Sequence, residues 1–175
     1  AHHHHHHGSM LKEVHELLNR IWGDIFELRE ELKEELKGFT VEEVSEVFNA
    51  YLYIDGKWEE MKYPHPAFAV KPGGEVGATP QGFYFVFAFP KEELSKEFIE
   101  DVIRAFEKLF IYGAENFLED FYNFEHPISG DEVWDRIVNS DEEMINFEVD
   151  LGFDKEEVKR EIKRFIELAR RYNLL

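Results

Sequence analysis

The sequence contains no cysteine, and this absence removes several kinds of chemistry at once. Disulfides, thiol nucleophiles, zinc ribbons and cysteine-bound iron–sulfur clusters are all excluded. No apolar run approaches the roughly 20 residues of a membrane-spanning helix, so we expect no integral membrane protein. Hydrolase elbows, P-loops and paired-histidine zinc motifs are also missing. We therefore expect no cofactor, and an enzyme is the less favoured class.

The residues that are present indicate a single folded domain. Ala1 to Ser9, with six successive histidines, is an expression tag, which leaves residues 10–175 as the domain. Hydrophobic residues make up 43% of the chain and aromatic residues 15%, which excludes a disordered protein. No signal peptide follows Met10, so we expect the protein in the cytoplasm.

Hydrophobic spacing predicts an α+β fold, with a mainly antiparallel sheet of about five strands packed by long helices. The predicted helices are 11–37, 41–48, 91–111, 133–138 and 155–172, and the predicted strands are 51–54, 57–63, 67–70, 83–89 and 145–151. Asp55-Gly56 predicts a type I′ hairpin turn. Residues 72–82 predict a connecting loop rich in glycine and proline, and 115–124 favour a helix.

Two patterns leave alternatives open. The apolar seam of the first helix, from Leu11 to Leu32, either faces its own sheet or forms a homodimer. Residues 83–105 resemble 147–169 at an offset of 64, which fits either a duplicated strand–helix unit or two units built by the same rules.

The charge of the chain is strongly negative, with 38 acidic residues against 20 Lys and Arg and a net charge of −18. Residues 113–150 hold twelve of the acids and one base, Arg136. Such a field repels phosphate backbones, so we expect no nucleic-acid partner. It attracts basic proteins or divalent cations, or it simply keeps the protein soluble.

Tyr51 to Tyr63 and Gly77 to Pro90, together with the Glu/Lys/Phe-rich, cysteine-free composition, resemble an uncharacterised family of hyperthermophilic archaea, a domain of unknown function and a structural-genomics target. The resemblance implies no activity, and no catalytic motif comes with it. The order of the elements also resembles small acidic dimeric chaperones that hold secretion substrates unfolded, in architecture alone.

Few residues have the character of a site. His65 stands before a proline, and Thr79 and Gln81 are the polar side chains of the 72–82 loop, so these three are the candidate ligand-binding residues. His126 with Asp131 and Asp135 could form an oxygen-rich metal site. Both sets also fit an ordinary turn and loop, because no spaced ligand pair fixes two ligands on one face.

Three functions follow, in order of preference. The aromatic excess favours a non-catalytic module, with or without homodimerisation, that binds a protein segment or a ligand against aromatic surface. The acidic 113–150 segment suggests a structural subunit that binds a basic protein partner. An enzyme based on carboxylate and histidine chemistry, or on a metal, requires His65 or His126 to meet a buried acid in a pocket.

Overall fold

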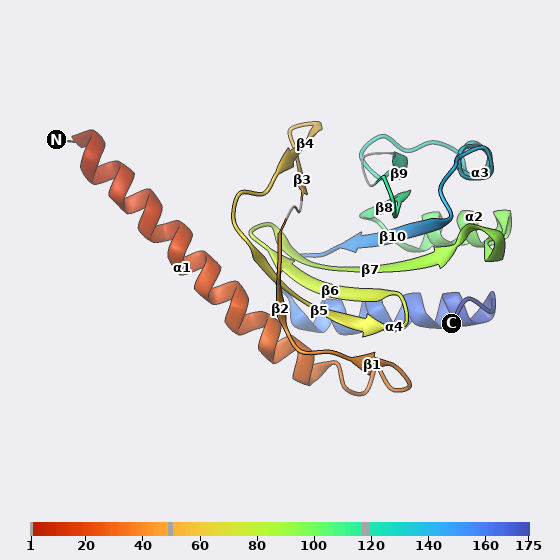
Figure 1. Cartoon of the computed structure of the whole chain (residues 1–175), viewed down its shortest axis with the longest axis horizontal. Helices are drawn as coiled ribbons and strands as arrows, with labels where there is room; N and C mark the ends of the chain where they lie inside the picture. The colour runs from red at the N-terminus through yellow and green to blue at the C-terminus, as the bar shows by residue number, and fades with distance from the viewer. Residues whose placement is uncertain (1, 49–50, 117–119) are drawn as a thin grey trace.

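A long antiparallel sheet organises the chain, whose computed structural model describes residues 2–48, 51–116 and 120–175 (Figure 1). The strand order is β1-β5-β6-β7-β10-β8-β9, with β2 also paired to β5, and β3 and β4 form a separate hairpin. The strands are β1 (Thr40–Val41), β2 (Ser45–Val47), β3 (Tyr51–Ile54), β4 (Lys57–Glu60), β5 (His65–Lys71), β6 (Gly74–Thr79), β7 (Gly82–Pro90), β8 (Leu109–Gly113), β9 (Asp120–Asn123) and β10 (Met144–Asp150). The predicted α+β class is confirmed, although the sheet has more strands than expected.

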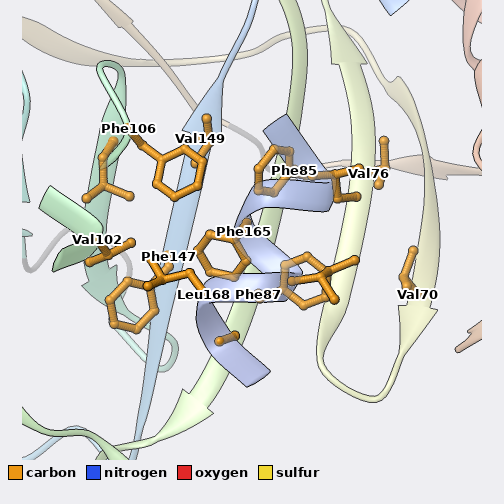
Figure 2. Close-up of a cluster of buried hydrophobic side chains, with 14 of the residues drawn as sticks. Val70, Val76, Phe85, Phe87, Val102, Phe106, Phe147, Val149, Phe165 and Leu168 are labelled. Carbon is orange, nitrogen blue, oxygen red and sulfur yellow. The ribbon is translucent and has the colours of Figure 1, made fainter. Parts of the chain in front are cut away.

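The helices and the sheet enclose an aromatic core. The helices are α1 (His2–Glu31), α2 (Lys96–Ala105), α3 (Gly130–Val138) and α4 (Lys155–Arg171), with a short 3-10 turn, η1 (Lys91–Glu93). On α4, Phe165 lies flat on Phe87 of β7, with ring centroids 5.3 Å apart and an interplanar angle of 15° (Figure 2). Phe85 and Phe147 add further buried rings from β7 and β10. Odd-numbered residues of these two strands therefore face the helices.

The C-terminal half of the apolar seam on helix α1 faces the sheet of its own chain. Its residues Ile21, Ile25 and Leu28 are fully buried, and the helix packs on β5 and β6 of its own sheet. The N-terminal part of α1 extends away from the rest of the molecule (Figure 1). None of the helices in the described parts of the chain combines the length and the apolar character that a membrane span requires.

The structure confirms one predicted turn, two predicted helix caps and one predicted strand. Asp55 and Gly56 both have positive φ, at 49° and 82°, as a type I′ turn between β3 and β4 requires. Ser129 and Asp154 cap α3 and α4 by accepting hydrogen bonds from backbone N–H groups of the first turn. Strand β10 has the alternation of buried and half-buried residues that its sequence predicts.

The helix predicted over 41–48 is wrong, because this segment forms the short strands β1 and β2 on β5. The loop predicted over 72–82 is also wrong, because most of it is strand β6. Two glycines of β6 lie where any larger side chain would clash with β7. A Cβ on Gly77 would lie 2.4 Å from Tyr84, and one on Gly74 would lie 2.6 Å from Phe87. Glycine in this strand therefore makes room for the rings of β7.

The first helix, predicted to reach residue 37, ends at Glu31. Two further errors concern β8 and β9. The helix predicted over 91–111 ends at Ala105, and Leu109 to Gly113 form a strand on β10. The helix favoured over 115–124 is wrong where it can be assessed, because Asp120 to Asn123 pair with β8; residues 117–119 lie outside the described residues. Adjacent apolar residues, here Phe121 and Tyr122, suit a strand that is covered on both faces.

Candidate functional site

The sheet face opposite α4 carries polar side chains and a pocket. Because residues alternate along each strand, the even-numbered residues of β10 and β7 point away from the aromatic core. Glu148 and Asp150 of β10, Tyr84 of β7, Glu75 of β6 and Tyr112 of β8 line a cavity of about 640 Å³. Neighbouring strands thus place three carboxyl groups and two phenols on one floor.

The β3–β4 hairpin supplies aromatic side chains to the same pocket. Tyr53 and Trp58 lie edge to face, 5.1 Å apart, and both contact Phe110 on the sheet. The indole Nε1 of Trp58 donates a hydrogen bond of 3.1 Å to Asp120 Oδ2 on β9. Phe124 also packs on Phe110, with centroids 5.2 Å apart, so aromatic rings form part of the walls of the pocket.

A hydrogen-bonded chain links one histidine to one carboxylate. Tyr84 donates its hydroxyl proton to Glu75 Oε2 at 2.8 Å, and His65 Nε2 lies 2.8 Å from the same hydroxyl. Because Tyr84 donates its single hydroxyl proton to Glu75, its oxygen can only accept from His65. Nε2 of His65 is therefore the protonated nitrogen, and Nδ1 keeps a lone pair. His65 is only 2% exposed, and burial lowers its pKa to about 4, so the ring is neutral at pH 7.

The second polar group is a pair of carboxyls on β10. Burial raises the pKa of Glu148 well above its usual value, and the neighbouring Asp150 raises it further. Burial also raises the pKa of Asp150, while a hydrogen bond from Glu148 and the charge of Lys108 act in the opposite direction. Tyr112 donates a 2.8 Å hydrogen bond to Glu148 Oε1. The two carboxyls are therefore coupled, and burial favours the protonated form of Glu148 more strongly than that of Asp150.

Carboxyl groups outnumber cationic side chains in the lining of the pocket. Four carboxyl side chains line it, those of Glu75, Glu125, Glu148 and Asp150, and Lys108 is the one Lys or Arg among its lining residues. Burial raises the pKa of Glu75, and the hydrogen bond from Tyr84 opposes this shift. Neutral His65 adds no compensating charge. A cation is favoured in this cavity and an anion is repelled.

All three predicted ligand-binding residues lie in the lining of this pocket. His65 belongs to the hydrogen-bonded chain described above. Thr79 and Gln81 form the turn between β6 and β7, where Thr79 Oγ1 accepts from the backbone N–H of Gln81 at 3.1 Å and donates to the carbonyl of Gly82 at 3.3 Å. Their contact with a ligand remains a prediction.

The predicted metal residues lie elsewhere. His126 lines a second, smaller cavity of about 390 Å³ beside β9. Asp131 forms an ion pair with Lys96, and the backbone carbonyl of Asp135 accepts from Asn139. Within residues 2–48, 51–116 and 120–175, no three His, Asp or Glu side chains are grouped so that they could hold a metal ion. A metal site at His126 therefore stays a prediction to which this geometry adds no support.

Sequence reasoning missed the floor of the pocket, namely Glu75, Tyr84, Tyr112, Glu148 and Asp150. A signal for two of them was present, because Glu148 and Asp150 are two residues apart on a strand that was predicted correctly. Two acids at this spacing on a central strand lie on one face. The alternation alone indicates that this face meets solvent, whereas the β3–β4 hairpin and Phe124 enclose it.

Comparison with known proteins identifies a family that the sequence matches. Residues 16–164 match a family described as "Protein of unknown function (DUF3201)". The match covers nearly all of the domain, including every strand of the pocket floor. No curated protein matches the chain.

Proposed function

The chain belongs to this DUF3201 family, and we propose that it is a small-molecule-binding protein whose ligand occupies the pocket between the polar sheet face and the β3–β4 hairpin. The observation that carries the proposal is the pocket itself. Its volume, about 640 Å³, lies within the range of small-molecule sites. Its polar groups converge on a floor and its walls carry aromatic rings, a combination that is usual for a ligand site.

The buried carboxyls support a site rather than a structural feature. Placing Glu75, Glu148 and Asp150 together on a partly desolvated floor raises the pKa of each. Such an arrangement destabilises the fold, and groups of this kind concentrate at functional sites. A merely structural face would be served better by apolar or hydroxyl side chains in the same strands.

The pocket also supports an enzyme as the second candidate. Burial raises the pKa of Glu148 well above its usual value, which is the direction that a general acid needs, and more strongly than it raises the pKa of Asp150 beside it. The enzyme hypothesis requires a histidine that meets a buried acid in a pocket. His65 meets this requirement only indirectly, because Tyr84 lies between it and Glu75. Binding without turnover favours the first candidate, and conversion of a bound ligand that Glu148→Gln abolishes favours the second.

The experiment for the first candidate is a fragment screen by two-dimensional NMR on tag-free protein. We expect bound fragments to shift signals of the β3–β4 hairpin and of β10. Val86→Trp would fill the pocket from β7 and remove these shifts, whereas the same change at the exposed Val138 of α3 would leave them. Fragments that bind equally to both variants, or only to other surfaces, would overturn the proposal.

We keep three further proposals beside it. Homodimerisation through the N-terminal part of α1 is supported by the apolar seam, and a basic protein partner by the acidic 113–150 segment. Cytoplasmic function in a hyperthermophilic archaeon is supported by the absence of cysteine and by the single glutamine, Gln81.

A further inference from the structure

The chemistry of the pocket narrows the ligand to one class, an inference that rests on the proposed binding function. We propose that the ligand is an organic cation with N–H donors, such as an alkyl diamine or a guanidinium compound, held between the carboxyl floor and the aromatic walls. Three separate features of the pocket lead to this class.

The first feature is the charge balance. Glu75, Glu125, Glu148 and Asp150 contribute carboxyl groups, and Lys108 alone among the lining Lys and Arg side chains is cationic. Lys108 lies on the Asp150 side, where its charge lowers the pKa of that residue. The Glu75 end of the floor has no cation of its own among the lining residues. A ligand cation would supply the missing positive charge there.

The second feature is an unpaired acceptor. His65 lines the pocket, is 2% exposed, and has no hydrogen-bond partner at Nδ1. Because Nε2 donates to Tyr84, Nδ1 is a hydrogen-bond acceptor. Burial removes its contact with water, and no protein donor replaces that contact. A ligand N–H can satisfy this atom, whereas a carboxylate or a carbonyl cannot. The feature therefore selects a donor independently of the charge balance.

The third feature is the set of aromatic rings around the pocket, in its walls and in its floor. Tyr53 and Trp58 come from the hairpin, and Phe124 and the phenol rings of Tyr84 and Tyr112 come from the sheet side. Aromatic faces attract alkylammonium and guanidinium groups, and the attraction grows where water is excluded. The same rings accept an alkyl chain, so a linear amine would fit both the walls and the floor.

The test compares three four-carbon compounds that differ in charge: 1,4-diaminobutane, 1,4-butanediol and succinate. Titration calorimetry of tag-free protein at pH 7.5 and constant ionic strength would measure each affinity. We expect saturable one-site binding of the diamine and no binding of the diol or succinate. Constant ionic strength matters because the net charge of −18 attracts any cation weakly.

Two variants locate the binding. Glu75→Gln removes the floor carboxyl that has no cation beside it among the lining residues, retains an acceptor for Tyr84, and should weaken diamine binding about tenfold or more. Glu167→Gln removes the same charge from an exposed site on α4, across the sheet, and should leave the affinity unchanged within about twofold. Asp150→Asn repeats the floor test if Glu75→Gln proves unstable.

Each outcome decides one of the two proposals. Equal weakening by Glu75→Gln and Glu167→Gln would mean diffuse surface attraction and would overturn the cation proposal. Tighter binding of the diol or succinate in the pocket would overturn the ligand class while the binding function survives. Fragment shifts in the pocket without any diamine affinity would likewise overturn the ligand class alone. Failure of every probe, together with an empty fragment screen, would remove both proposals.

Discussion

Glu148→Gln should stabilise the protein at neutral and alkaline pH, against the usual effect of changing a buried residue. Glutamine has the shape of the protonated glutamic acid that we infer at this position. Its Oε1 can accept from Tyr112, and its amide N–H can donate to Asp150 as the carboxyl proton does. The variant therefore keeps both hydrogen bonds. It also removes a carboxyl group whose ionisation is unfavourable in the folded state.

The sign of the effect follows from proton linkage. The pKa of Glu148 is raised in the folded state, so the unfolded chain releases this proton at a lower pH than the folded protein does. Stability from this residue is complete below the unfolded pKa of about 4.5 and falls as the pH rises towards the folded pKa. Each tenfold difference between the two acid dissociation constants costs about 1.4 kcal/mol. A difference of this size corresponds to about 3–6 °C in the melting temperature of a domain this long.

Urea denaturation and thermal melts at pH 4, 6 and 8 test this reasoning. We expect the variant and the parent to agree at pH 4 and the variant to gain about 1 kcal/mol or more by pH 8. Glu167→Gln, which changes an exposed residue, should follow the parent throughout. A Glu148→Gln protein that is less stable than the parent at pH 8 would show that Glu148 is ionised and favourably bound, and would refute its raised pKa.

Further predictions concern the strands, the core and the first helix. Gly77→Ala should displace the Tyr84 ring, because the new Cβ would lie 2.4 Å from it; ligand-binding shifts at His65 should vanish while circular dichroism stays native, and an unchanged His65 NMR signal would contradict this. Phe165→Ala should lower the free energy of unfolding by about 3–5 kcal/mol in urea, since it removes a fully buried ring that stacks on Phe87; a loss below about 1 kcal/mol would show a loosely packed core. Removing residues 1–16, before the buried part of α1, should leave the melting temperature within about 2 °C if the protein is a monomer and convert a dimer to a monomer in light scattering if α1 forms the interface.

The parts of the fold that could be predicted are those in which local pattern and tertiary role agree. The alternation in 145–151, the Asp55-Gly56 turn and the Asp154 cap each act over a few neighbouring residues, and each is confirmed. Strand β6 could not be predicted, because its glycines indicate a loop when read alone. Their role depends on Tyr84 and Phe87, which lie on the next strand, and single-sequence periodicity does not report that pairing.

The site was predictable in outline and not in its chemistry. His65, Thr79 and Gln81 are polar residues near turns, which makes them candidates from sequence, and the structure gathers them in one pocket. Glu148 and Asp150 are two acids among 38, and abundance hides them. What distinguishes them is burial, which depends on a hairpin about 90 residues earlier in the sequence closing over the sheet.

The placement of the acids also changes the interpretation of the charge itself. The 113–150 segment suggests an acidic surface for a basic protein, yet several of its acids face inwards. Glu142 is 4% exposed and accepts from the backbone N–H groups of Glu115 and Asn116 at 3.0 and 2.8 Å. Glu148 and Asp150 lie on the pocket floor. Negative potential focused inside a cavity acts on what fits the cavity, so this part of the excess charge favours a small cation over a protein surface.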